Sequence, residues 1–410
     1  MHRRLLNSDY FSPFSNIIFN FQGTKFSTFR ALIEVRCPQL IEFEGIIKKR
    51  KEKIVSNGTI LIIMVKEDCF LTLPVLTQLL DYLYSDNVDF QKLGIDLILK
   101  VQKAADFIGI NRLVWLCERF LYSTLGFHNV YEVLKFADQI QVASVKSFCV
   151  AFAQKNWMEF SANKKGLEVL GLDLFQEITV TLHTFNQNAN QTIANSYLDH
   201  AAPVSTLYTD LKNLHKRMEF TDSIVEFSDA VTLPFHRCFF AAHEPKFAQL
   251  FLEKKDSHKP FKFPISPESF SYLQEFIYYG SCNITPPCAC EMIEEMVEKY
   301  SLEKFREKCE ETLRKEITDD IVLRSLRLTY LPWNKTRPKL IHLRKECLDF
   351  IASHFVDIDI PSIRSIQPCG LAIAYDILDI LHSQKRSGKG RRISYLPKQT
   401  PKSALKSSHS

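Results

Sequence analysis

Two histidines and a cysteine lie close together in one short stretch of the sequence. Residues 233–245 read LPFHRCFFAAHEP, which places His236, Cys238 and His243 within eight positions. Such side chains can bind a metal ion or act as acid, base or nucleophile. A tetrahedral metal site needs a second pair of ligands, and none follows nearby in the sequence. We therefore expect His236 to begin a buried helix with Asp222 as its polar partner, because a buried polar group is tolerated when it is paired.

Three more cysteines form a second cluster, in the segment CNITPPCAC at residues 282–290. Cys282, Cys288 and Cys290 could bind zinc, but a fourth ligand is missing and the Cys-x-Cys spacing is tight. The Pro-Pro pair is typical of a loop that enters a helix, since proline is favoured in the first helical turn. The sequence thus predicts no metal site and no cofactor.

The sequence lacks the common motifs of enzymes. It contains no G-x-S-x-G, P-loop, G-x-G-x-x-G or H-E-x-x-H pattern. Serine, histidine and aspartate side chains from distant positions could still converge in the fold, so a hydrolase or metal enzyme stays open as an alternative. The main expectation is a protein that is not an enzyme and has no catalytic residues.

Positive charge is concentrated in two short segments. The chain has 410 residues and a net charge of +5, but residues 384–410 carry eight Lys or Arg and no acid, which leaves 44 basic against 47 acidic residues elsewhere. A body with this balance is not expected to bind nucleic acid. The basic segments 45–58 and 385–410 are predicted to be a solvated loop and a disordered tail, with nuclear import or an anionic surface as the alternative role. Ser394 follows two arginines and is a candidate phosphorylation site.

The cysteines and the apolar runs indicate the compartment. Eleven cysteines, an odd number, lie among apolar neighbours, and no signal-peptide core opens the chain. We read them as buried, reduced thiols in a cytoplasmic protein, with the nucleus or endomembranes as alternatives. The longest apolar run, residues 59–65, is too short to span a membrane and predicts a buried strand.

An internal repeat organises the chain. Residues 79–88 resemble residues 273–284, and residues 108–121 resemble 300–313. Further along, residues 144–157 resemble 342–355. Apolar residues recur at helical spacing in the last two pairs of segments, which predicts helices buried on one face. Repetition over such a long offset indicates a duplicated domain.

Each copy of the repeat begins with a predicted β-hairpin. Residues 16–29 and 222–235 alternate apolar and polar positions around the turn signals Gln22-Gly23 and Ser228-Asp229. We expect each copy to continue with two short helices, a strand and then many helices. The fold class is therefore α+β and mostly helical, with two small sheets capped by helices.

These elements resemble a known family. The hairpin followed by FHRCFFAAHEPKF, SFSYLQEFIYYG and a Cys-Glu helix is similar to a BTB/POZ domain, and the helices after each copy are similar to its BACK extension. The order BTB-BACK-BTB-BACK resembles the tandem BTB/POZ proteins of the leucine-zipper-like transcriptional regulator family, which are cullin-3 adaptors. The first copy has Asn16 and Phe29 where the second has the usual Asp222 and His236. No kelch propeller, which recruits the substrate in that family, is found in the sequence.

The resemblance implies a domain order, in which residues 186–215 form a linker. The expected parts are BTB/POZ 1 at 10–125, BACK-like helices 1 at 126–185, BTB/POZ 2 at 216–315, BACK-like helices 2 at 316–384 and the tail at 385–410.

The resemblance also implies a function. The protein is expected to be a non-enzymatic scaffold, foremost a substrate adaptor of a cullin-3 ubiquitin ligase, in which Phe251 and Glu253 contact the cullin. Its other expected partners are a second BTB domain, as homodimer or heterodimer, and a ubiquitination substrate such as a Ras-like GTPase. The alternative is a self-associating, transcription-linked scaffold that does not bind cullin.

Overall fold

The computed structural model describes residues 14–55, 58–67, 69–187, 201–253, 259–331, 340–353 and 370–386. These residues form two compact units, a large one that ends at Asn283 and also includes Tyr300–Leu302, and a second one made of Ile284–Lys299 and the residues from Glu303 onward. Both are dominated by helices, and the described strands all lie in the first unit, so the protein is a mostly helical α+β protein with small sheets. None of the described helices is long and apolar enough to cross a membrane.

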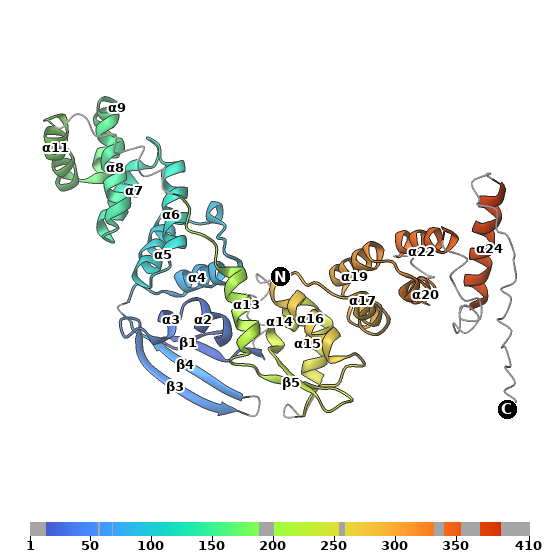
Figure 1. The fold of residues 1–410 in the computed structure, drawn as a ribbon. Helices are drawn as coiled ribbons and strands as arrows, with labels where there is room; N and C mark the ends of the chain where they lie inside the picture. The colour runs from blue at the N-terminus through green and yellow to red at the C-terminus, as the bar shows by residue number, and fades with distance from the viewer. Residues whose placement is uncertain are drawn as a thin grey trace, which may run out of the picture. The chain divides into compact units, whose positions relative to one another are not determined.

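The first unit opens with a four-stranded sheet in the order β2-β1-β4-β3 (Figure 1). The hairpin predicted at residues 16–29 is confirmed as β1 (Ile17–Phe21) and β2 (Thr24–Thr28), with Gln22 and Gly23 both at positive φ in the turn. The strand predicted at residues 59–65 is confirmed as β4 (Gly58–Val65), which pairs in parallel with β1. Helices α2 (Arg30–Arg36) and α3 (Gln39–Glu42) cover one face of this sheet.

The prediction of a solvated loop at residues 45–58 is wrong. Residues Ile47–Val55 form β3, an edge strand that pairs antiparallel with β4. The charged side chains suggested a solvated loop. However, an edge strand can expose both of its faces, and charged residues are common on edge strands. Pairing with the apolar strand β4 supplies the backbone hydrogen bonds that hold the basic segment extended.

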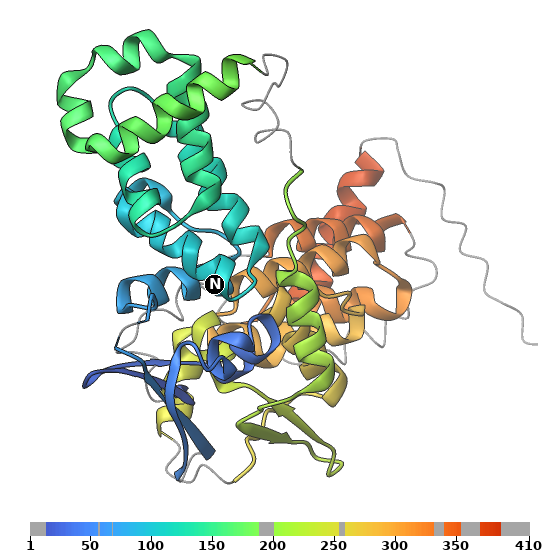
Figure 2. The same ribbon diagram turned by 90° about the vertical axis from the view of Figure 1, so that its left-hand side faces the viewer.

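Helices follow the first sheet in the chain. The segment predicted at 108–121 is helix α6, and that at 144–157 is helix α8, each shifted by a few residues. The bounds are α4 (Leu73–Ser85), the short 3₁₀ helix η3 (Phe90–Lys92), α5 (Ile95–Phe107), α6 (Asn111–Thr124), α7 (Val130–Gln139), α8 (Ala143–Lys155), α9 (Trp157–Ala162), α10 (Lys164–Leu170) and α11 (Leu172–Gln187). Helix α7 packs against α8 and α10, and α8 against α11, which makes a helical array (Figure 2).

The second hairpin is confirmed in the segment predicted at 222–235. It consists of β5 (Ser223–Glu226) and β6 (Thr232–Phe235), after helix α13 (Leu207–Arg217). Helices α14 (Arg237–His243), α15 (Pro245–Glu253) and α16 (Pro267–Tyr279) follow. Of the expected further strand, the described residues show one bridge, in which Phe261 pairs in parallel with Val225. This parallel contact corresponds to that of β4 with β1.

The cores of the two copies differ in composition. Around the first sheet the buried side chains are largely aliphatic, such as Leu32, Ile33, Leu61 and Ile63. Around the second hairpin a cluster of rings fills the core, each within about 6.3 Å of a neighbour between centroids: Phe235, Phe240, Phe247, Phe251, Phe261, Phe263 and Phe270. Aromatic rings bury a large area per residue, so a very short sheet still encloses a core.

The second unit is a helical array. Helix α17 packs against α19 and α20, and α22 packs against α19, α20 and α24. The segments predicted at 300–313 and 342–355 are helices α19 and α22. The bounds are α17 (Pro286–Met292), the π-helix η4 (Ile293–Val297), α18 (Glu298–Tyr300), α19 (Glu303–Lys315), α20 (Asp319–Leu328), α22 (Ile341–Ser353) and α24 (Gly370–Arg386).

Candidate protein-interaction site

The start of helix α14 is held by the hairpin that precedes it. Asp222 accepts a hydrogen bond from the backbone N–H of Arg237 at 2.9 Å and another from its Nε at 3.1 Å. The N-cap residue, His236, makes no capping hydrogen bond with its side chain. Because the first N–H groups of a helix lack partners within it, the carboxylate of Asp222 takes over the capping role. The Arg237 side chain is 7% exposed and that of Asp222 is 17% exposed, so this is a largely buried ion pair.

The ring of His236 is buried and has other partners than the predicted Asp222. Its Nε2 lies 2.7 Å from the backbone oxygen of Glu219, and its Nδ1 lies 2.5 Å from the hydroxyl of Tyr278. A carbonyl only accepts, so Nε2 carries the proton and Nδ1 accepts from the hydroxyl. Burial lowers the pKa of His236 below its usual value, against the opposing effects of Asp222 and the Glu219 carbonyl. The expected pair is thus replaced by two contacts, Asp222 with Arg237 and His236 with Tyr278.

Similar contacts, made by different side chains, hold the start of α2 after the first hairpin. Asn16 accepts a hydrogen bond from the backbone N–H of Arg30 at 2.5 Å, as Asp222 does from Arg237. The hydroxyl of Tyr84 accepts from the backbone N–H of Phe29 at 3.4 Å, as that of Tyr278 does from His236 at 3.1 Å. Tyr84 also hydrogen-bonds the Thr28 hydroxyl, which takes the place of the histidine ring.

The two hairpin regions contact each other reciprocally within the first unit. The guanidinium of Arg30 lies 4.7 Å from the ring centroid of Phe220, and that of Arg237 lies 5.9 Å from the ring centroid of Phe14. Each phenylalanine stands two residues before the capping residue of its own copy. The arginine at the start of α2 therefore contacts the phenylalanine that precedes β5, and the arginine at the start of α14 contacts the phenylalanine that precedes β1. The Phe14 ring also meets Phe251 edge to face, with centroids 6.2 Å apart.

Helix α13 joins the two copies. It packs against α2 and α4 of the first copy and against α16 of the second. Arg36, whose side chain is 3% exposed, bridges Asp86 at 2.6 Å and Asp210 of α13 at 3.2 Å. Burial acts to raise the pKa of Asp86, but hydrogen bonds from Ser205 and Arg36 outweigh it and the pKa is lowered. The predicted linker thus contains a helix that is packed and charge-paired.

The predicted cullin contact is only partly on the surface. Phe251 is 3% exposed and lies in the aromatic core, so it cannot offer its ring to a partner in this conformation. On helix α15 it shares the buried face with Phe247 and Ala248. Glu253 is exposed and accepts a hydrogen bond from Gln249, and Leu252 beside it is 51% exposed. The exposed apolar residue next to Glu253 is therefore Leu252, not Phe251.

The cysteines lie in the core as thiols. The ten described cysteines are free and nine of them are buried, the exception being the half-buried Cys69. Burial raises the pKa of Cys290 to about 11 and that of Cys238 well above its usual range. Among the described residues, no group of three His, Cys, Asp or Glu side chains is placed to hold a metal ion. Ser394 lies outside the described residues.

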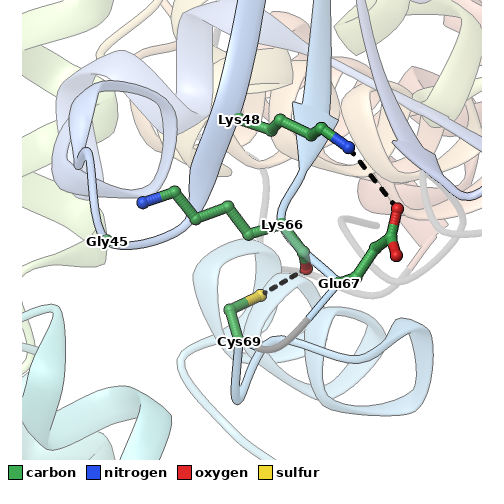
Figure 3. A pocket seen from close by; sticks show the side chains of 5 residues that line it. All are labelled: Gly45, Lys48, Lys66, Glu67 and Cys69. Carbon is green, nitrogen blue, oxygen red and sulfur yellow. Dashed lines mark hydrogen bonds and ion pairs between the residues drawn. The ribbon is translucent and has the colours of Figure 1, made fainter.

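One open pocket of about 320 Å³ lies beside the first sheet (Figure 3). Gly45, Lys48, Lys66, Glu67 and Cys69 line it. Lys48 pairs with Glu67 at 3.4 Å, and the Cys69 thiol donates to the Lys66 carbonyl at 3.1 Å. None of the site residues predicted from the sequence lines this pocket.

Matching spacings in the sequence mark the residues that join the two hairpin regions. Phe14-Ser-Asn16 and Phe220-Thr-Asp222 share one spacing, and Tyr84 and Tyr278 match in the repeat. Side chains that recur at fixed spacing in both copies are candidates for a shared structural role.

Comparison with known proteins identifies part of the chain. Residues 211–317 match the family model of the BTB/POZ domain. A segment of 127 residues, 30% of the chain, is 28% identical to the Inhibitor of Bruton tyrosine kinase from Xenopus laevis, of which it covers 9%. The matched region of the family contains β5, β6 and helices α14 to α19, the elements around Asp222 and His236. The chain therefore contains a BTB/POZ domain, which is a protein-interaction module, at residues 211–317.

Proposed function

We propose that the protein is a non-catalytic interaction scaffold in which two BTB-type halves pair within one chain. The BTB/POZ domain at residues 211–317 would be the second half, and residues 10–125 the first. The matching contacts at Asn16 and Asp222, and at Tyr84 and Tyr278, support a common frame for the two halves.

The observation that carries the proposal is the reciprocal contact of Arg30 with Phe220 and of Arg237 with Phe14. A symmetric dimer has an interface in which residue i of one copy contacts residue j of the other, and the reverse. Here both contacts form inside a single chain. The face around α14 is then occupied by the first half, and pairing in cis takes the place of the expected homodimer.

The scaffold would act as a substrate adaptor of a cullin-3 ubiquitin ligase in the cytoplasm. This part rests on the resemblance to the tandem BTB/POZ-BACK proteins and on the exposed pair Leu252 and Glu253 at the end of α15. The helices α7 to α11 and α20 to α24 would be the BACK-like extensions. Ubiquitin transfer would belong to the recruited ligase, and this chain would raise the local concentration of substrate.

Binding of purified cullin-3 tests the adaptor role. We expect capture of the N-terminal region of cullin-3 by the immobilised chain, and loss of at least about tenfold in affinity for Leu252→Asp/Glu253→Lys, since charge reversal and loss of an apolar contact each cost about 1 kcal/mol or more. Leu371→Asp/Asp379→Lys on α24 is the matched control, because both of these side chains are also exposed.

Two outcomes separate the alternatives. If the wild-type chain does not bind cullin-3 at micromolar concentration, the adaptor role is wrong and the self-associating, transcription-linked scaffold is favoured. If both double variants bind as well as the wild type, cullin-3 binds elsewhere and the contact at Leu252 and Glu253 is wrong.

A further inference from the structure

One edge of strand β3 has no neighbouring strand among the residues that the structure describes. It is the last strand in the order β2-β1-β4-β3, and residues 49–53 pair with β4 on the other edge. Half of the N–H and C=O groups of such an edge strand point outward, where another strand can pair with them. Among the described residues, the second hairpin forms a two-stranded sheet of β5 and β6 without a counterpart of β3.

Three lysines line one face of β3. The register pairs Lys49 with Met64, Lys51 with Ile62 and Lys53 with Ile60. Side chains of such pairs lie on one face of the sheet. This face is the one away from the core, because Ile60, Ile62 and Met64 are half-buried whereas the alternate residues Leu61 and Ile63 are buried.

The charged residues on the two faces of β3 differ in whether they form ion pairs. On the core side, Glu52 pairs with Arg30 at 3.5 Å and with Arg50 at 3.9 Å. Lys49, Lys51 and Lys53 are exposed and have no ion-pair partner within the described part of the chain. The outer face therefore presents three positive charges with the two-residue period of a strand.

The pocket at the start of β3 continues this surface. The strand has an irregularity between Ile47 and Lys49, so Lys48 is the additional residue of a bulge. Its ammonium group turns to Glu67, while the side chain of Lys66 extends to the opposite side of the pocket (Figure 3). The positive edge thus runs from Lys53 to the pocket.

We infer that the free edge of β3 binds an acidic, extended segment of a partner protein as a fifth strand. Acidic side chains at alternate positions of that segment would face Lys49, Lys51 and Lys53, and its backbone would pair with the outer edge. Charge complementarity selects this occupant, because a second copy of β3 would bring lysine opposite lysine, which is unfavourable. Addition of a strand to a sheet edge is a common mode of peptide recognition. The inference is independent of cullin-3 binding.

The test uses the full chain and a short synthetic peptide in which glutamate alternates with valine. We expect binding that weakens as salt is raised, because the charges are exposed. Lys49→Gln/Lys51→Gln/Lys53→Gln should weaken it about tenfold, as expected for the loss of three exposed ion pairs. Lys155→Gln/Lys164→Gln/Lys165→Gln, which removes three exposed lysines from the helical array, is the matched control and should bind like the wild type.

Backbone methylation separates strand pairing from simple charge attraction. A peptide N-methylated on the amides of one edge and a peptide methylated on the other edge have the same charge. We expect one of them to lose binding and the other to keep it. Equal binding of both, or no binding of the unmodified peptide, would overturn the inference, as would binding of phosphatidylserine vesicles in place of the peptide.

Discussion

Two corners of this protein have similar backbone contacts but different side chains. The first corner is the hairpin β1–β2 with the start of α2, and the second is the hairpin β5–β6 with the start of α14. In the first, Asn16 caps α2, Phe29 precedes the helix, and the Thr28 hydroxyl hydrogen-bonds the Tyr84 hydroxyl. In the second, Asp222 caps α14 and forms an ion pair with Arg237, and the His236 ring accepts a hydrogen bond from the Tyr278 hydroxyl. A neutral corner and a charged corner therefore hold equivalent helices. The comparison indicates that His236 has a structural role, since its counterpart is a phenylalanine.

The largest difference between the corners should appear when the capping residues are removed. Asp222→Ala leaves the Arg237 guanidinium buried without its carboxylate, and loss of one partner of a buried pair costs about 3 kcal/mol or more. Asn16→Ala removes a neutral cap and should cost about 1 kcal/mol. Hydrogen exchange of the α14 and α2 amides measures the two local losses of stability separately. Equal losses at the two helices would show that the charge of the second corner adds nothing.

A smaller difference is expected in the response to acid. The pKa of His236 is lowered in the folded protein, so the unfolded chain binds more protons below about pH 6.5 and stability falls as the pH decreases from there. His215, whose pKa burial also lowers, contributes in the same direction. His236→Phe, which copies the first corner, should reduce this acid sensitivity, while Phe29→His should introduce it in the first corner.

Thermal unfolding as a function of pH measures this second effect. An unchanged pH dependence of the His236→Phe variant would contradict the buried, neutral state of this histidine. The variant should also lose about 1 kcal/mol at neutral pH, because the Glu219 carbonyl and the Tyr278 hydroxyl lose their partner.

The sequence predicted local elements better than long-range pairing. Hairpins, the apolar strand and the helices followed from periodicity and turn residues, which act over a few positions. The basic strand β3 was missed because its conformation depends on its neighbour β4 and not on its own composition. The surface position expected for Phe251 is wrong because the helical phase of α15 places its ring on the buried face, with Phe247 and Ala248.

At the site, too, the sequence indicated the residues better than their long-range partners. Asp222 and His236 were expected to pair with each other, but their partners in the structure, Arg237 and Tyr278, depend on how α14 and α16 pack. The reciprocal contacts of Phe14 and Phe220 join residues about 200 positions apart in sequence. Periodicity alone cannot specify such contacts, although the shared spacing before each hairpin marked the residues.

The mass of the purified chain in solution is the most direct test of pairing in cis. The proposed pairing in cis predicts a single species of 47.6 kDa by native mass spectrometry at micromolar concentration, because each half would already occupy the pairing face of the other. Phe14→Glu/Phe220→Glu should release these faces and produce dimers or larger species. A wild-type chain that is a stable dimer at the same concentration, and that the double substitution converts to a monomer, would contradict pairing within the chain.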